Sequence, residues 1–393
     1  MPDAFIVTGT RSPIGKFMGG LMDLPAPKLG ALAIAEVLKR GKVAPELVDE
    51  VIMGCVLQAG LGQNPARQAA IHGGLPDTIS AVTVNKVCGS GLQAVMQATQ
   101  TIRAGDNDVV IAGGFESMSR APYLLQTARL GGFKYGDQTA TDEMIQDGLW
   151  CAFEGCHMGN SAEHIAKKHA VSREDQDRFS AQSQQRAAAA WAVGNFNDEV
   201  FRVTVGSGPK AKTIDKDESI RAETTVEGLA KLRTAFPGGT SVTAGNASTI
   251  NDGSAALLVA SNRGLEKLGA KPMARVVSYA TTGVAPKDIF IAPVSAVRLA
   301  LQKANLNLAD IDYFELNEAF AAQMLACNYD LKIDEAKLNV NGGAIALGHP
   351  IGASGARCLV TLLSVLKQRN AKRGLVSLCL GGGNAVAMVV ERV

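Results

Sequence analysis

The chain has 393 residues and a formal net charge of +2, and apolar residues make up 47% of it. This size predicts two or three structural units around a large buried interior, and the small charge excludes a global field that would recruit nucleic acid or an anionic membrane. No apolar run reaches the roughly 18–20 residues of a membrane span. The chain opens on an apparent strand at 4–7 instead of a secretory signal, and its seven cysteines are scattered. We therefore expect a cytoplasmic protein with reduced thiols.

Three segments near the start of the chain recur, in the same order, near its end. The first is a helix, a polar linker and a strand; the second is a strand, a glycine-rich loop and a helix; the third is a strand with a glycine-rich turn. The pairs are 29–54 with 293–320, 82–95 with 338–359, and 108–118 with 374–390. These matches predict an α/β protein of two duplicated βαβ-rich halves with mostly parallel sheets.

Residues 119–249 have no counterpart in the second half and are richer in charge and turn residues. Within them, 161–194 is predicted to be helical, and Ser172 with an acidic turn behind it is typical of a helix N-cap. A long insertion in a doubled core is usually a lid or a binding module. We expect three units: an N-terminal core half (1–118 plus 250–270), an inserted loop domain (119–249) and a C-terminal core half (271–393).

Four residues with catalytic potential lie where predicted strands end in loops: Cys88, Asn317, His349 and Cys379. Ligands of parallel α/β sheets bind beyond the carboxyl ends of the strands, so duplication predicts that these loops converge. Cys88 precedes Gly-Ser-Gly and a helix, whose positive end would lower the thiol pKa while free amides hold an oxyanion. Cys379 precedes three glycines, which expose backbone amides in the same way. His349, in a rigid Gly-His-Pro loop, can move a proton.

Each of these residues also has a purely structural interpretation. Cys88 and Cys379 would then be buried packing residues or a disulfide pair, which a reducing compartment disfavours. His349 would be a hydrogen-bonded structural side chain, and Glu318 is expected to be a buried hydrogen-bond partner. A zinc site is disfavoured because no CxxC spacing occurs. The remaining histidines expected at surface or packing positions are His72, His164 and His169.

Six motifs together resemble the signatures of the thiolase family. They are NKVCGSGLQA (85–94), ESMSRAPY (116–123), TAGNAS (243–248), NEAFAAQ (317–323), NGGAIALGHPIGASGAR (341–357) and CLGGGNA (379–385). The resemblance covers the whole chain in the correct order, and within the family it is to the biosynthetic, acetoacetyl-CoA type. It implies the thiolase fold: duplicated halves in a layered αβαβα core with an inserted loop domain.

The resemblance also implies a reaction, the Claisen condensation of two acetyl-CoA molecules to acetoacetyl-CoA and CoA, with its reverse thiolysis. Cys88 would carry the acetyl group, His349 would activate it, and Cys379 would be the acid/base for the second acetyl-CoA. The N–H groups of Cys88 and Gly381 would hold the first oxyanion. His349 and a water fixed on Asn317 would hold the enolate. The alternative within the family is a 3-ketoacyl-CoA thiolase of fatty-acid β-oxidation with a broader chain-length range.

For coenzyme A, the resemblance implies a tunnel formed mostly by the insertion. Ser248 would bond the pantetheine, and Arg221 and Phe236 would lie near the adenine. The expected tunnel lining is Leu149, His157, Met158, Ala244, Ala319 and Phe320. Met158 would narrow the acyl pocket. Gly228 stands where a hydroxyl residue is often found, which puts one CoA contact in doubt.

No metal and no cofactor are expected, because coenzyme A is here a substrate and product. The expected partners are acetyl-CoA, acetoacetyl-CoA, CoA and further copies of the chain in a homodimer or homotetramer, with 120–140 as a tetramer-forming or substrate loop. Two rival functions remain open. A ketoacyl-synthase of the same superfamily would condense malonyl thioesters and would not need Cys379, and a non-catalytic CoA-binding scaffold would not acylate Cys88.

Overall fold

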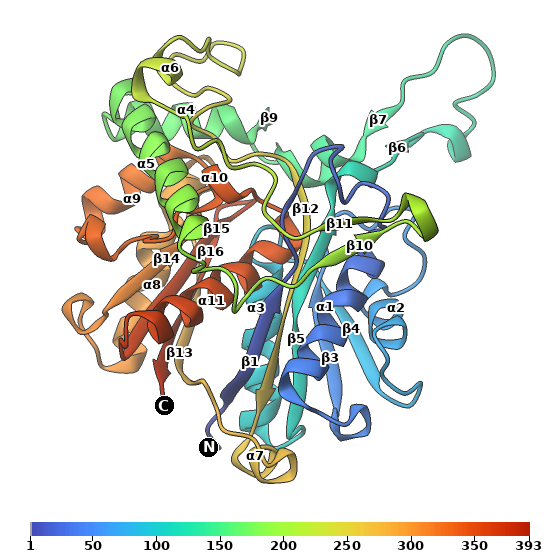
Figure 1. The fold of residues 1–393 in the computed structure, drawn as a ribbon. Coiled ribbons are helices and arrows are strands. Elements are labelled where there is room, and N and C mark those ends of the chain that lie inside the picture. The colour runs from blue at the N-terminus through green and yellow to red at the C-terminus, as the bar shows by residue number, and fades with distance from the viewer. Residues whose placement is uncertain (1) are drawn as a thin grey trace.

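The computed structural model describes residues 2–393, and among them ten strands join in one sheet (Figure 1). From one edge to the other the order is β4 (Ser80–Val84), β3 (Glu50–Gly54), β5 (Val109–Ser117), β12 (Asn251–Ala260), β1 (Phe5–Arg11), β13 (Ala274–Gly283), β16 (Asn384–Arg392), β15 (Arg373–Leu380) and β14 (Tyr313–Leu316), with the short β2 (Gly15–Lys16) pairing beside β12. Strands β1 and β13 pair only through Phe5–Arg275 and Ile6–Ala274. The sheet is therefore two half-sheets joined at a short seam.

The two half-sheets repeat one arrangement on either side of that seam. The order β1, β12, β5, β3 on one side corresponds to β13, β16, β15, β14 on the other. The helix α1 (Ala26–Gly41) before β3 corresponds to α8 (Ala292–Ala304) before β14, and α3 (Ser90–Ala104) corresponds to α11 (Ile351–Gln368). The repeated sequence segments therefore fold into equivalent elements.

The expectation of mostly parallel sheets is wrong. Only β3–β4, β3–β5 and β14–β15 are parallel, and the other pairs in the sheet are antiparallel. Strand β16 follows β15 directly through the three-glycine turn that ends at Gly383, and so short a connection can only join antiparallel strands. The glycines of that turn were noted in the sequence, but their consequence for strand direction was missed.

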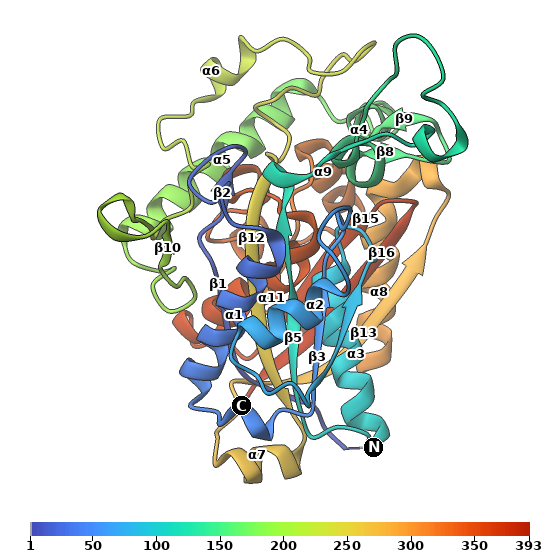
Figure 2. The ribbon, with the colours of Figure 1, turned by 90° about the vertical axis from the view of Figure 1, so that its right-hand side faces the viewer.

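The layers follow from alternation along the buried strands. In β5, Val109 and Ile111 pack with α1 and with α2 (Pro65–His72) on one face, while Val110 and Ala112 pack with α3 and α11 on the other. Helix α8 packs on β13 and β16 in the second half. Figure 1 shows α3 and α11 near the middle of the molecule, and Figure 2 shows α1 and α2 on the side that faces the viewer there.

Glycines let α3 and α11 approach closely, and this approach positions the site. A Cβ atom on Gly355 would lie 2.4 Å from the backbone nitrogen of Leu92, and one on Gly91 would lie 2.8 Å from that of Ala356. Such distances exclude any side chain without movement of the backbone. Cys88 lies just before α3 and His349 just before α11, so the helix crossing brings the two loops together.

The insertion covers the end of the core that carries these loops, at the top of Figure 1. It contains the helices α4 (Met158–Lys168), α5 (Arg173–Ala192) and α6 (Val226–Ala230), and the hairpins β6–β7 (Tyr123–Leu124, Thr141–Asp142), β8–β9 (Trp150–Cys151, Cys156–His157) and β10–β11 (Val203–Val205, Lys212–Ile214). Ser172 accepts a hydrogen bond from the Asp175 N–H, so the predicted N-cap is confirmed. The remaining helices are α7 (Asn262–Leu268), α9 (Ala321–Leu331) and α10 (Ala344–Leu347). None of the helices formed by residues 2–393 combines the length and hydrophobicity that a membrane span requires.

Candidate active site

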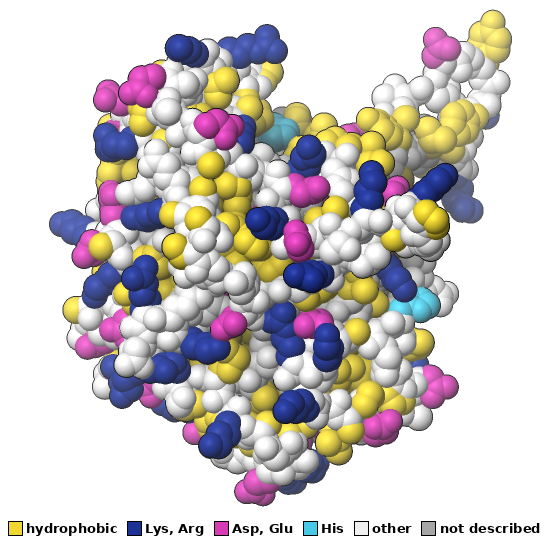
Figure 3. Space-filling view, viewed as in Figure 1, with side chains coloured by type: hydrophobic (Ala, Val, Ile, Leu, Met, Phe, Trp, Pro, Cys, Tyr) yellow, Lys and Arg dark blue, Asp and Glu magenta, His cyan; other side chains and the backbone are white. Residues whose placement is uncertain are grey.

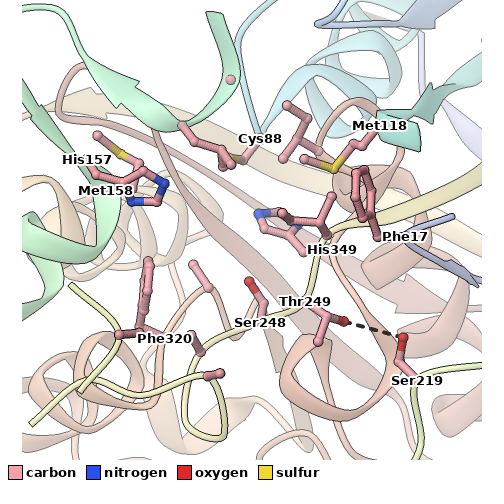
Figure 4. A pocket seen from close by; sticks show the side chains of 18 of the residues that line it. Phe17, Cys88, Met118, His157, Met158, Ser219, Ser248, Thr249, Phe320 and His349 are labelled. Carbon is pink, nitrogen blue, oxygen red and sulfur yellow. Dashed lines mark hydrogen bonds between the residues drawn. The ribbon is translucent and has the colours of Figure 1, made fainter. Parts of the chain in front are cut away.

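A cavity of about 630 Å³ lies where the loops of both halves meet the insertion (Figure 4). Every predicted site residue except Asn317 lines it. From the core loops come Cys88, His349, Cys379, Gly381, Ala319 and Phe320; from the insertion come Leu149, His157, Met158, Arg221, Phe236, Ala244 and Ser248. The predicted convergence of the catalytic loops is therefore what the fold produces.

Cys88 is held on a strained turn between β4 and α3. The residue before it, Val87, has φ 48°, a left-handed conformation that a β-branched residue rarely adopts. Asn85 Oδ1 accepts from the Val87 N–H at 3.0 Å, and Ser90 Oγ donates to the Val87 carbonyl at 2.6 Å. Our sequence analysis missed Asn85 and Ser90, although short polar residues beside a glycine turn are typical of such local hydrogen bonds.

Burial raises the pKa of the Cys88 thiol to about 12, although the backbone N–H groups of Cys88 and Gly381 point at the sulfur and lower it. The expectation that the helix start would lower this pKa is therefore wrong for the free protein. Helix α3 begins at Ser90, with Gly89 as its N-cap, and loss of water around the sulfur has the largest influence on the Cys88 pKa. Cys88 is a neutral thiol at rest and needs a base. The two N–H groups are placed to stabilise negative charge beside the sulfur.

His349 is that candidate base. Its Nδ1 atom lies 2.6 Å from Ser354 Oγ, which in turn donates to the Pro350 carbonyl at 2.8 Å. Because the serine hydrogen is used on Pro350, Nδ1 must carry the imidazole hydrogen and Nε2 must be the free acceptor. Burial, with a further contribution from the Arg357 cation, lowers the pKa of His349 to about 3. The imidazole is therefore neutral and can accept a proton.

Asn317 follows β14 and lies behind His349, not on the cavity wall. Its Nδ2 atom is 3.4 Å from His349 Nε2. On the other side its Oδ1 atom accepts from Arg357 Nη2 at 3.3 Å and from the Cys358 thiol at 3.7 Å. Asn317 thus touches the predicted base directly. Asn317 therefore takes part in the site through His349 and does not line the cavity itself.

Cys379 ends β15 and is 2% exposed. Burial raises the pKa of its thiol well above the ordinary range, and negative charge on Cys88 raises it further. The two sulfurs therefore cannot both be thiolates. An acylated Cys88 carries no negative charge, so it no longer raises the pKa of Cys379. Gly382 and Gly383 follow with φ 81° and 86°, conformations that glycine adopts without strain.

The outer part of the cavity is an apolar tunnel. The His157 ring stacks on Phe236 with centroids 4.8 Å apart, and Phe236 meets Phe320 edge-on at 6.4 Å. Met158 lies beside them and is 9% exposed. Figure 4 shows His157 and Met158 across the cavity from His349. An apolar wall of packed aromatic rings suits a thin, flexible chain.

Met118 and Ile351, which lie within the motifs, also line the cavity but were assigned no role from the sequence. Further lining residues were missed because they belong to no motif: Lys16, Phe17, Ser219, Thr249, Ile250, Ile289 and Phe290. Gly228 is exposed and does not line the cavity. The missing hydroxyl there therefore leaves the wall of the cavity unchanged.

The residues expected to play structural roles do so. Glu318 is buried and accepts from Ser183 Oγ at 2.6 Å and from Asn339 Nδ2 at 2.8 Å. The three histidines His72, His164 and His169 lie outside the cavity. All seven cysteines are free thiols. Within residues 2–393, no group of three or more His, Cys, Asp or Glu side chains is arranged to hold a metal ion.

Comparison with known proteins gives consistent matches along the whole chain. The family model described as the thiolase N-terminal domain matches residues 4–263, and that of the thiolase C-terminal domain matches residues 270–392. The chain is 52% identical to an acetyl-CoA acetyltransferase of Pseudomonas aeruginosa over 100% of both chains. It is 54% identical to one of Chromobacterium violaceum over 98% of this chain and 99% of that protein. The crystal structure of the Bacillus anthracis acetyl-CoA acetyltransferase superposes with a TM-score of 0.97 at 41% identity, covering 100% of this chain and 99% of that one.

Proposed function

This chain belongs to the thiolase family, and on that basis we propose that it is an acetyl-CoA C-acetyltransferase. It joins two acetyl-CoA molecules into acetoacetyl-CoA and CoA, and it catalyses the reverse thiolysis. The observation that carries this proposal is one cavity in which the thiols of Cys88 and Cys379, a neutral imidazole and the Gly381 amide meet. The names of full-length relatives favour it over a broad-range 3-ketoacyl-CoA thiolase.

The first half-reaction transfers an acetyl group to Cys88. The sulfur attacks the thioester carbonyl while His349 Nε2 takes the thiol proton. Because the Cys88 pKa is about 12 and that of His349 about 3, prior proton transfer is steeply uphill, so the proton moves as the C–S bond forms. The N–H groups of Cys88 and Gly381 hold the oxyanion. The carbon–sulfur bond to CoA then breaks, Cys379 gives its proton to the departing CoA sulfur and becomes a thiolate, and His349 keeps the proton that it took from Cys88.

The second half-reaction forms the carbon–carbon bond. Cys379 removes an α-proton from a second acetyl-CoA, whose thioester makes that proton more acidic than in an oxygen ester. The Nε2–H group of His349, protonated in the first half-reaction, and a water fixed on Asn317 donate to the enolate oxygen. The enolate carbon attacks the acetyl carbonyl on Cys88, the bond from that carbonyl to Cys88 breaks, and His349 returns its proton to the Cys88 sulfur while Cys379 keeps the proton that it removed. Two thiols are needed because one carries the acyl group while the other moves the proton.

The tunnel binds coenzyme A in this proposal. Ser248 bonds the pantetheine, and its backbone N–H is fixed by the Ala319 carbonyl at 3.0 Å. Arg221 and Phe236 lie at the adenine end. The tunnel needs no cofactor, because CoA is substrate and product. Met158 restricts the acyl group to short chains.

The setting of the enzyme is also part of the proposal. The free state of all seven cysteines is consistent with the cytoplasm. The terminal strand β4, where Val82 is 42% exposed, supports a homodimer, and the apolar side chains of the 120–140 loop support a homotetramer. We keep the division into 1–118 with 250–270, 119–249 and 271–393 as the proposed units.

The proposed function is tested by following Cys88. The protein is incubated with acetyl-CoA, and the mass of the Cys88 peptide and the formation of acetoacetyl-CoA are measured. We expect a single acetyl adduct, lost in Cys88→Ala. Cys379→Ala should still acquire the adduct but should not condense, whereas Cys55→Ala, which changes a thiol outside the cavity, should do both.

Other outcomes identify the rival functions. Full activity of Cys379→Ala with consumption of malonyl-CoA would indicate a ketoacyl-synthase. CoA binding without any adduct would indicate a scaffold. Thiolysis of C4, C8 and C16 3-ketoacyl-CoA then tests the substrate range, and strong C16 turnover would refute the short acyl pocket.

A further inference from the structure

A buried arginine lies behind the catalytic residues and has no role in the mechanism above. Arg357, on α11, is 1% exposed and does not line the cavity. Its Nη2 atom donates to Asn317 Oδ1, and its Nη1 atom lies 3.8 Å from Glu315 Oε2, too far for a hydrogen bond. Within residues 2–393, its Nε and Nη1 atoms have no hydrogen-bond partner. A buried cation so poorly satisfied costs free energy.

Its contact with Asn317 decides which way that amide faces. A carboxamide has one accepting and one donating end, and the two can exchange by rotation. A guanidinium has only donors, so it holds the oxygen of Asn317 toward α11. The Nδ2 donor then faces His349 Nε2 at 3.4 Å. With the amide reversed, its oxygen would face the lone pair of Nε2, which is repulsive.

One acid, Glu315, lies within ion-pair distance of the arginine, on the strand that precedes Asn317. Glu315 lies two residues before Asn317, at the end of β14, and is 1% exposed. Burial raises its pKa to about 8, the Arg357 cation lowers it, and the nearby acids Glu318 and Glu199 raise it. Arg357 therefore links the end of β14 to α11, the helix that begins beside His349.

We propose that Arg357 is a positioning residue, which holds the Asn317 amide with its N–H groups toward His349 and the acyl-handling end of the cavity. This rests on the proposed function, because Arg357 acts only through those two residues. The Cys358 thiol, 3.7 Å from the same oxygen, is a weak donor and cannot replace it. A misplaced Asn317 would impair enolate stabilisation and leave the CoA tunnel intact.

The test compares Arg357→Met, which removes the donors and the charge, with Arg357→Lys, which keeps a shorter cationic donor. For Arg357→Met we expect kcat of thiolysis to fall about 10²-fold, the usual effect of a small misplacement, with KM changed less than about threefold. Arg357→Lys should recover part of kcat. Leu362→Ala, a buried residue of the same helix that packs against Gly374, is the control for destabilisation and should retain kcat.

A double-mutant cycle separates positioning from a merely structural role. If Arg357 acts through Asn317, Asn317→Ala/Arg357→Met should have a kcat within about threefold of Asn317→Ala alone, because coupled residues are not additive. The proposal would be overturned if the losses in kcat of the two single variants multiplied in the double variant. It would also be overturned if Arg357→Met left kcat unchanged, or raised KM by as much as it lowered kcat. If Arg357→Met does not fold, Arg357→Lys replaces it in the double-mutant cycle, and the same comparison of kcat values decides between the two roles.

The wild-type protein distinguishes this failure from failure of the proposed function. If the wild type does not acetylate Cys88 or condense acetyl-CoA, the proposed function is wrong. If it does both while the Arg357 and Asn317 effects multiply, only the positioning role is wrong.

Discussion

The imidazole of His157 lies stacked on the ring of Phe236, with ring centroids 4.8 Å apart and planes at 28°. The stack holds the start of α4, where Met158 is the first residue. A Cβ atom on Gly159 would lie 2.1 Å from the Phe236 ring, so the glycine is what allows the ring to pack there. The wall that we propose limits the acyl pocket is therefore held in place by aromatic packing.

Met158→Ala should lengthen the acyl pocket. Each buried CH₂ contributes about 0.8 kcal/mol, so room for two more should raise kcat/KM for C6 relative to C4 by about tenfold. Thiolysis of the C4 and C6 3-ketoacyl-CoA substrates measures this ratio. Met96→Ala, a buried methionine of α3 outside the cavity, should leave it unchanged. An unchanged ratio in Met158→Ala would mean that another side chain sets chain length.

Ser354→Ala should slow acetylation of Cys88. Without the hydroxyl, the Nδ1 hydrogen of His349 loses its acceptor, and the tautomer with a free Nε2 is no longer favoured. We expect about a tenfold lower rate of acetylation, since general-base catalysis contributes roughly 10²–10⁴-fold in all. Rapid-quench mass spectrometry of the Cys88 peptide measures it. Ser364→Ala, on the same helix, should acetylate at the wild-type rate, and equal rates for both variants would contradict the tautomer assignment.

Alkylation of Cys88 should report a neutral thiol. With a pKa of about 12, only about one molecule in 10⁵ carries the thiolate at pH 7. Because the Cys88 pKa lies above this whole range, the thiolate fraction keeps increasing as the pH rises. The rate of iodoacetamide labelling should therefore increase about tenfold per pH unit between about pH 7 and 10. Peptide mass spectrometry follows the Cys88 site, with Cys88→Ala as background. A plateau below about pH 8 would instead indicate a preformed thiolate–imidazolium pair.

The 120–140 loop should govern assembly. It projects from the body of the molecule (Figure 3) and exposes Tyr135 at 99%, Leu130 at 86% and Phe133 at 52%. Apolar side chains gathered on one projecting loop form a patch of the kind that marks protein–protein interaction sites. In light scattering, Leu130→Asp/Tyr135→Asp should convert a tetramer to a dimer, whereas Lys134→Glu should not. A wild-type chain that is dimeric at assay concentration would show that the loop does not assemble tetramers.

Local features of the sequence were sufficient for the duplicated order of elements and for the predicted side chains that meet in the cavity. The Ser172 cap and the glycine-rich loops around Cys88, His349 and Cys379 depend on residues a few positions away, so their meaning is encoded locally. The thiolase fold was recognised from motifs spread along the chain, and it is confirmed. Sequence also identified the tunnel lining, although only from resemblance to relatives.

Tertiary structure decided what depends on distant groups. The direction of strands, the raised pKa of Cys88 and the place of Asn317 behind His349 all follow from which segments pack together and exclude water. The role proposed for Arg357 follows in the same way, because Arg357 lies 40 positions from Asn317 in sequence. Burial and hydrogen bonding are properties of the folded neighbourhood, whereas a motif reports only residues that are adjacent along the chain.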